Sequence, residues 1–184
     1  MLGVPVAGRS GQTAEIISPV PADCAHAHSI SAIHGLADLP MHTELSHRPL
    51  PCSYVLLGCV DPGQPVVSTR IVRWSELAFS KEEIALLKSA PMFVRSGRRS
   101  FYATILPQSG EYVRYDTSCM EAIDRAGREA LDVVARRLAS FSPTKHVWTA
   151  GEVIAIDNWS VLHGRDPAAD SSGRKLVRMM IDGR

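Results

Sequence analysis

The sequence contains no apolar run of about 18 residues or more, the length that a helix needs to cross a bilayer. Its first ten residues also lack the charged start and apolar core of a secretory signal peptide. The formal net charge is only +1, so no strong field would attract nucleic acid or an anionic membrane. We therefore expect a cytoplasmic protein that binds neither membranes nor nucleic acid.

Paired cysteine spacing is absent as well. The four cysteines are Cys24, Cys52, Cys59 and Cys119. Their separations match neither a zinc-binding pattern nor a disulfide framework. In a cytoplasmic chain we expect all four thiols to be reduced.

The 184 residues, 45% hydrophobic and 21% charged, have the composition of an ordinary globular protein. This length predicts a single domain over residues 1–184 with a sizeable core. Short apolar runs alternate with glycine- and proline-containing turns, and there is one long amphipathic stretch. Such a pattern predicts an antiparallel sandwich or barrel with helical support.

Several elements can be placed along the chain. Residues 54–60 form a continuous apolar run that predicts a buried strand, and residues 66–72 are its expected pairing partner. Capping boxes that begin at Ser80 and Ser118 predict two helices, the second from about residue 120 to 140. The other predicted strands form two hairpins from residues 92–95, 100–106 and 111–116.

Residues 39–47, LPMHTELSH, contain an H-x-E triplet formed by His42, Thr43 and Glu44. On an extended segment alternate residues point to one face, so the imidazole and the carboxylate converge. A histidine from a distant segment would complete the facial triad of a non-haem iron(II) site. Alone the triplet is common, and two solvated polar residues are the alternative interpretation.

Residues 151–165, GEVIAIDNWSVLHGR, provide such a histidine, His163, after a β-branched run and a polar turn. Residues 173–181 predict another strand, on which Arg174 and Arg178 are four residues apart and so face the same side. A guanidinium inside a barrel is costly unless it binds an anion, which it does best in a bidentate manner. The pattern therefore predicts metal ligands with carboxylate-binding arginines beside them.

Three stretches of the sequence resemble the taurine dioxygenase and clavaminate synthase-like iron(II)/2-oxoglutarate oxygenases. They are LPMHTELSHRPLPCSYVLLGCV, GEVIAIDNWSVLHGR and RKLVR, within a resemblance that extends from about residue 29 to the C-terminus. The amino-acid hydroxylase branch, which includes asparagine oxygenase, is the most similar. The resemblance implies a mainly β protein with supporting helices, folded as a double-stranded β-helix (a jelly roll, or cupin-like barrel).

The resemblance implies that His42, Glu44 and His163 bind Fe(II), with 2-oxoglutarate and O₂ as co-substrates. Arg174 follows His163 by eleven residues and would bind the distal carboxylate of 2-oxoglutarate. Arg178 would then meet an acid group of the substrate. Spacing alone does not rank the two arginines, so the reverse assignment stays open.

Thr69 lies where the family has a threonine that hydrogen-bonds the co-substrate, but Val67 and Ser68 replace the usual glycines before it. A threonine that only occupies a strand position is an equal alternative. Arg165 is expected to pair with an acid near the barrel mouth, and residues 157–158 to make orienting hydrogen bonds whose partners cannot be assigned.

The implied function is a biosynthetic dioxygenase. It would hydroxylate, desaturate or cyclise an aliphatic C–H of a small amino-acid-like or carboxylate-bearing substrate, with release of succinate and CO₂. Glu44 argues against halogenation, because halogenating relatives lack the carboxylate ligand.

Only 41 residues precede His42, whereas relatives carry a longer segment there that covers one side of the barrel. Three consequences are open: a pocket open to a large substrate, a homodimer whose partner completes the wall, or an incomplete enzyme. Two other functions therefore remain. One is a jelly-roll protein that binds a metal and an acid without redox chemistry, as an isomerase or sensor. The other is an inactive, truncated scaffold subunit.

Overall fold

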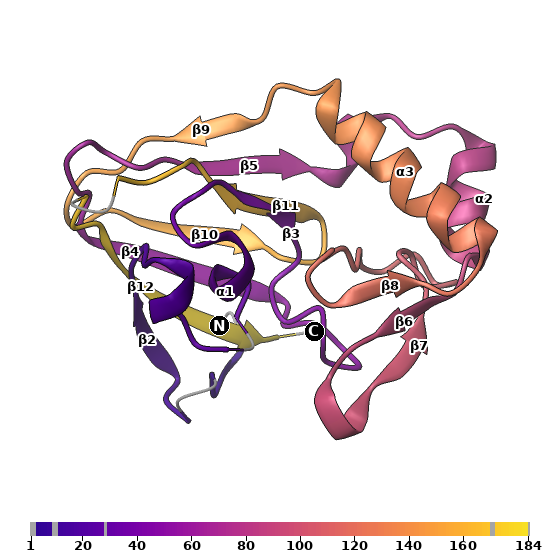
Figure 1. Cartoon of the computed structure of the whole chain (residues 1–184), viewed down its shortest axis with the longest axis horizontal. Coiled ribbons are helices and arrows are strands. Elements are labelled where there is room, and N and C mark those ends of the chain that lie inside the picture. The colour runs from indigo at the N-terminus through magenta and orange to yellow at the C-terminus, as the bar shows by residue number, and fades with distance from the viewer. Residues whose placement is uncertain (1–2, 9–10, 28, 170–171, 184) are drawn as a thin grey trace.

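Two antiparallel β-sheets face each other and form the body of the protein (Figure 1). The computed structural model describes residues 3–8, 11–27, 29–169 and 172–183. The first sheet has the order β1 (Val4–Val6), β12 (Lys175–Asp182), β4 (Tyr54–Asp61) and β10 (Val153–Asp157), with β2 (Ala14–Ile17) also paired to β12. The second has the order β3 (Leu39–His42), β11 (Val161–Arg165), β5 (Thr69–Arg73) and β9 (Thr144–His146). The predicted mainly β jelly roll with supporting helices is confirmed.

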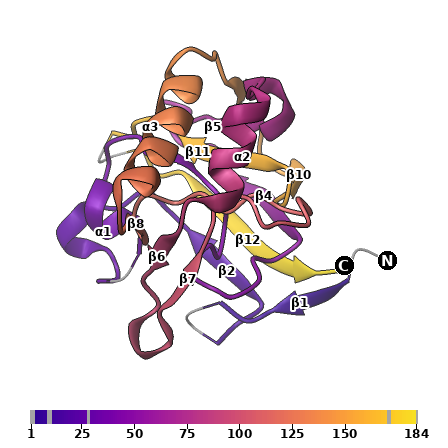
Figure 2. The ribbon, with the colours of Figure 1, turned by 90° about the vertical axis from the view of Figure 1, so that its right-hand side faces the viewer.

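A smaller sheet and the helices lie beside this body (Figure 2). The small sheet has the order β7 (Phe101–Ala103), β6 (Met92–Val94) and β8 (Met120–Ala122). The helices are α1 (Ser31–His34), α2 (Lys81–Ser89) and α3 (Arg125–Ala139), and the 3₁₀ turns are η1 (Ala22–Cys24), η2 (Trp74–Leu77) and η3 (Gly97–Arg99). Within the described ranges, none of the helices combines the length and the apolar character that a bilayer crossing requires.

The core between the sheets is built on the central strand β4. Its alternate side chains Val55, Leu57 and Cys59 are 0–5% exposed, and they pack with Leu176 and Met180 of β12. This period of two is the strand pattern, in which every second side chain points to the same face.

The second sheet has its own apolar face. Val72 of β5 and Leu162 of β11 are almost fully buried, and they pack in one cluster with residues of α2 and α3 such as Leu87 and Val134. Because neighbouring strand residues point to opposite faces, His163 is directed away from the helices, toward the first sheet. Helices α2 and α3 therefore pack on the outer face of the second sheet. The inner face of this sheet carries polar side chains such as His163.

Two strand predictions are wrong. Residues 66–72 were expected to pair with residues 54–60, but β5 pairs with β11 and β9, and β4 pairs with β12 and β10. In a jelly roll, consecutive strands cross between sheets, and a local apolar pattern does not indicate this. Residues 111–116 form no strand; their backbone instead bonds to separate partners, such as Val113 N to Trp159 O at 2.9 Å. The hairpin of β6 and β7 is confirmed.

The helix predictions differ in outcome. The capping box of Ser80 and Glu83 is present and starts α2 as expected. The second helix starts at Arg125 rather than near residue 120, because Asp124 caps it by accepting a hydrogen bond from Gly127 N at 2.7 Å. Residues 120–122 form β8 instead, paired with β6, which places Met120 in the core at 3% exposure. Pairing and burial thus override the weaker local helix signal.

Candidate metal centre and surrounding cavity

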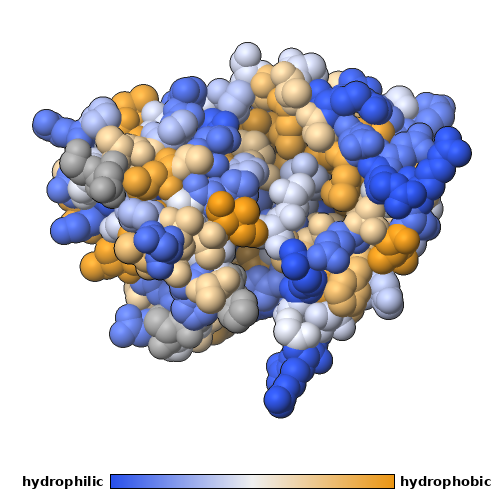
Figure 3. Space-filling model, viewed as in Figure 1, coloured by the Kyte–Doolittle hydropathy of each residue, from blue (hydrophilic) through white to orange (hydrophobic). Residues whose placement is uncertain are grey.

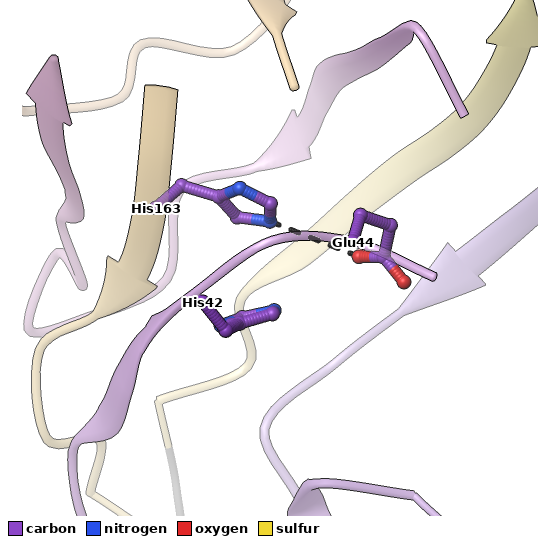
Figure 4. Close-up of side chains that lie close together, drawn as sticks. All are labelled: His42, Glu44 and His163. Carbon is purple, nitrogen blue, oxygen red and sulfur yellow. Dashed lines mark ion pairs between the residues drawn. The ribbon is translucent and has the colours of Figure 1, made fainter. Parts of the chain in front are cut away.

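Three side chains that the sequence analysis singled out meet between the sheets (Figure 4). His42 ends β3 and His163 lies in β11, and these two residues are direct partners across the antiparallel pair. Their ring centroids are 4.5 Å apart. Glu44 lies in the turn after β3, not in a continuing strand as expected, yet it faces the same point. One ligand atom from each of the three lies within 4.8 Å of the others.

The hydrogen bond of one ring and the pKa of the other suit metal binding. His42 Nδ1 lies 2.9 Å from Pro40 O, and since a carbonyl only accepts, Nδ1 is the donor; in the neutral ring this leaves Nε2 available to a metal. His163 Nε2 lies 3.7 Å from a carboxylate oxygen of Glu44. Burial and the neighbouring His42 lower the pKa of His163, which favours its neutral, ligating form.

The Glu44 side chain is only 13% exposed but remains ionised. Burial alone raises the pKa of its carboxyl, but Arg178 and the two histidines outweigh this and hold the pKa well below its usual range. Arg178 Nη1 lies 3.1 Å from both Glu44 oxygens, and its Nη2 lies 2.9 Å from Glu15. Two neutral imidazoles and one carboxylate form the donor set that non-haem iron(II) takes on one face. The residues present therefore fit such an ion.

Asn158 holds the backbone of the turn that carries Glu44. Its Oδ1 accepts from Glu44 N at 2.8 Å, and its Nδ2 donates to Glu44 O at 3.0 Å and to Cys52 O at 2.8 Å. Asn158 is completely buried, so these bonds are shielded from water. Orienting bonds from residues 157–158 were expected, and the structure places them on the peptide of Glu44.

A second clamp was not anticipated from the sequence. The guanidinium of Arg114, only 1% exposed, donates to the carbonyls of Ser46, Arg48 and Pro49, just after Glu44. In the sequence, Arg114 lies between Val113 and Tyr115, inside the segment that was wrongly predicted as a strand, so no buried role was expected for it. Together with Asn158, Arg114 ties both ends of the turn to the body of the protein.

Replacing Asn158 with alanine should therefore weaken metal binding without removing a ligand. Outer partners of metal ligands typically contribute about 10- to 100-fold in affinity, and we expect a loss of Fe(II) affinity in that range. The measurement is an anaerobic Fe(II) titration. Asp157→Ala, one residue earlier at the end of β10 and with a side chain that accepts from Trp159 N at 3.2 Å, is the matched control and should retain wild-type affinity. Equal losses in both variants would contradict a specific role for Asn158.

Arg174 lies immediately before β12 and is 5% exposed. Its Nη2 donates to Thr69 Oγ1 at 2.9 Å, and Trp148 Nε1 donates to the same oxygen at 3.0 Å. Among the described residues no carboxylate pairs with Arg174, in contrast to Arg178. Burial and the nearby Arg165 lower the pKa of Arg174 to about 10, so it remains a cation at neutral pH. Arg174 is thus a buried cation without a counter-ion in the described chain.

The expectation for Arg165 is wrong. Its Nη2 donates to the carbonyls of Gly35 at 2.7 Å and Ala37 at 2.5 Å, and no ion pair joins it to an acid among the described residues. Carbonyl oxygens after a helix end are good acceptors for a guanidinium, and here they lie closer than any carboxylate. Arg165 therefore anchors the chain between α1 and β3.

A cavity of about 1200 Å³ surrounds these groups. One wall carries His42, Glu44, His163, Thr69, Arg174 and Arg178. The remaining lining residues come from the N-terminal segment within residues 15–27 and 29–33, from the turn at residues 95–97 and from residues 116–119. Figure 3 shows the surface hollowed between the side that carries α1 and the side that carries β6 and β8. The cavity is large enough for a co-substrate and a second small molecule together.

Comparisons with known proteins give one family match and several similar proteins. The family model described as taurine catabolism dioxygenase TauD, TfdA family, matches residues 62–180, which include Thr69, His163, Arg174 and Arg178 but not the H-x-E triplet. An L-lysine 3-hydroxylase of Catenulispora acidiphila is 27% identical over 176 residues, covering 84% of this chain and 48% of that protein.

Solved structures share the fold. Asparagine oxygenase, in complex with Fe(II), 2S,3S-3-hydroxyasparagine and succinate, is 19% identical with a TM-score of 0.79, over 99% of this chain and 61% of that one. The non-heme iron oxygenase OrfP, in complex with Fe and alpha-ketoglutaric acid, is 23% identical with a TM-score of 0.79, over 100% of this chain and 62% of that one. The chain thus spans about half the length of the curated relative and about three fifths of these two solved chains.

Proposed function

Because this chain belongs to the taurine catabolism dioxygenase TauD, TfdA family, we propose that it is an iron(II)- and 2-oxoglutarate-dependent oxygenase of an amino-acid-like substrate. The observation that carries this proposal is the convergence of His42, Glu44 and His163 on one point of the cavity wall. With iron and 2-oxoglutarate bound, such a site activates O₂ and couples hydroxylation of an aliphatic C–H to the release of succinate and CO₂. Desaturation and cyclisation use the same ligand set and depend on how the substrate is placed.

The protein's own residues prepare the site for the metal. His42 offers Nε2, because Pro40 holds the proton on Nδ1, and Glu44 offers a carboxylate that Arg178 keeps ionised. Three ligands on one face leave the other positions to co-substrate and O₂. The presence of Glu44 also argues for hydroxylation over halogenation.

Arg174 and Thr69 are assigned to the distal carboxylate of 2-oxoglutarate. Arg174 is the better choice of the two arginines because Arg178 already has the carboxylates of Glu15 and Glu44 as partners, whereas Arg174 has no carboxylate partner among the described residues. A guanidinium bonds a carboxylate with two charge-assisted hydrogen bonds, each about 1.5–3 kcal/mol. The incoming anion would thus supply the counter-ion that the buried cation lacks.

The substrate is proposed to be an amino acid or a similar zwitterion. The curated relative is named as a lysine hydroxylase, and the solved neighbours were captured with hydroxyasparagine and with (3S)-hydroxy-L-Arg. In this chain, the cavity wall carries charges of both signs, with Glu15 and Asp116 as acids and Arg178 as a base near the candidate metal. Arg178 is assigned to the acid group of the substrate, which would compete with Glu15 for the Nη2 of Arg178 while Nη1 stays on Glu44.

The proposal is tested by adding Fe(II) and then 2-oxoglutarate to the metal-free protein under anaerobic conditions. A weak visible charge-transfer band that needs both additions, and that is lost in His163→Ala, is the expected result. Amino acids are then screened for succinate release in air. A protein that binds Fe(II) but shows no band with 2-oxoglutarate would contradict the proposal.

A further inference from the structure

We infer that Trp148 is a positioning residue for the co-substrate site, because it directs the hydroxyl proton of Thr69 toward the anion that Arg174 binds. This inference rests on the proposed function, since the anion is taken to be the distal carboxylate of 2-oxoglutarate. Trp148 itself does not line the cavity, and its indole hydrogen bond reaches the site through Thr69.

Thr69 Oγ1 takes part in two hydrogen bonds. A hydroxyl has two acceptor lone pairs and one proton. Trp148 Nε1 and Arg174 Nη2 lie 3.0 and 2.9 Å from Thr69 Oγ1, and both groups are donors that cannot accept. Thr69 must therefore be the acceptor in both bonds, and both of its lone pairs are occupied.

Because Trp148 and Arg174 occupy both lone pairs of Thr69 Oγ1, the hydroxyl proton must point away from these two donors. No acceptor for it is found among the described residues, although Thr69 is only 2% exposed. Thr69 and Arg174 both line the cavity. The hydroxyl proton of Thr69 and the guanidinium of Arg174, which has no carboxylate partner among the described residues, can therefore bind the same ligand group. An acceptor-only group such as a carboxylate satisfies both at once.

Trp148 is held firmly enough to act in this way. It is 3% exposed and packs in the core with Leu57, Cys59 and Leu176. The ring of His146 lies edge-on to it, with centroids 4.4 Å apart, and His146 is the strand partner of Thr69. The indole N–H therefore has a fixed position opposite Thr69. Without it, Thr69 would have a free lone pair and could turn its proton away from the cavity.

The test compares two ligands that differ only at the distal end. In 2-oxovalerate a methyl group replaces the distal carboxylate of 2-oxoglutarate, while the metal-binding end is the same. Both are titrated anaerobically into Fe(II)-loaded protein. We expect Trp148→Phe to raise the Kd of 2-oxoglutarate about 3- to 10-fold and to leave the Kd of 2-oxovalerate within about twofold. Thr69→Val should have the same selective effect, and the double variant should lose no more than Thr69→Val alone.

Trp159→Phe is the matched control, because that indole also donates one buried hydrogen bond, to Pro51 O at 3.0 Å, away from Thr69. It should not change the ratio of the two Kd values. Equal losses for both ligands in Trp148→Phe, or additive losses in the double variant, would overturn the inference. If the wild-type protein shows no band with 2-oxoglutarate, the proposed function fails instead.

A second measurement uses only the wild-type protein, so its result does not depend on whether a variant folds. In the Zn(II)-loaded wild-type protein, ¹⁵N NMR reports the indole N–H groups of the three tryptophans. We expect 2-oxoglutarate to shift one indole N–H resonance that 2-oxovalerate leaves in place, because the bonds of one hydroxyl polarise each other. Identical spectra with the two ligands would overturn the inference.

Discussion

Glu44→Ala should abolish co-substrate turnover and reduce Fe(II) affinity by more than about 100-fold, since even outer partners of metal ligands contribute 10- to 100-fold. The substitution removes one of the three converging ligand groups. Among the described residues, Glu44 is also the one carboxylate that lies beside both histidines, so the substitution removes the negative charge that would balance a divalent cation there. Arg178 keeps Glu15 as a partner, so the fold is expected to survive the change.

Fe(II) titration and succinate release measure this prediction. Glu129→Ala removes an exposed carboxylate on α3 and should behave as the wild type. Glu44→Asp keeps a carboxylate on the same turn, so it should retain more Fe(II) than Glu44→Ala. Undiminished turnover in Glu44→Ala would exclude the facial-triad assignment.

Arg174→Met should have opposite effects on binding and on stability. Loss of two charge-assisted bonds of about 1.5–3 kcal/mol each corresponds to an increase of at least about 100-fold in the Kd of 2-oxoglutarate. The unliganded protein should not lose thermal stability and is expected to gain it. The reason is that the substitution replaces a buried cation, which has no counter-ion among the described residues, with an apolar side chain of similar length.

Anaerobic titration of 2-oxoglutarate and the Tm of the unliganded protein measure the two effects. Arg98→Met, on an exposed turn, is the control for loss of one positive charge and should change neither value. Unchanged co-substrate affinity in Arg174→Met would reverse the roles of the two arginines and assign 2-oxoglutarate to Arg178. A large fall in Tm would mean that the guanidinium supports the fold rather than the ligand.

Five residues of the candidate site could be proposed from short local patterns, whereas Thr69 was named only through the family resemblance. The H-x-E triplet predicted two side chains on one strand face; Glu44 instead lies in a turn and still converges with His42. The apolar run before His163 predicts β10, which precedes the strand that carries this histidine. The same holds for the strand with Arg178 and for α2, whose capping box is a local signal. The predicted mainly β fold followed from the same periodicities. None of these patterns depends on knowing which strands are neighbours.

Features that arise from competition or long-range pairing were missed. The helix predicted from the capping box at Ser118 does not begin there; α3 begins after Asp124 instead. Residues 120–122 are stabilised more by pairing with β6 and by burial of Met120 than they would be by a helical turn. The predicted pairing of β5 with β4 was wrong because the chain crosses from one sheet to the other between these two strands. Arg165 donates to backbone carbonyls instead of pairing with an acid, because the backbone around Gly35 lies within hydrogen-bond distance of its guanidinium.

By itself, the sequence determined which side chains have the chemistry of a metal and carboxylate site, because residue types and strand periodicity are local properties. Only the tertiary structure decided how they are held. Among the described residues it gives carboxylate partners to Arg178 and none to Arg174, and it places Asn158 against Glu44 and Trp148 against Thr69. Those contacts join residues about 80 to 130 positions apart, and no local pattern encodes a hydrogen bond of that range.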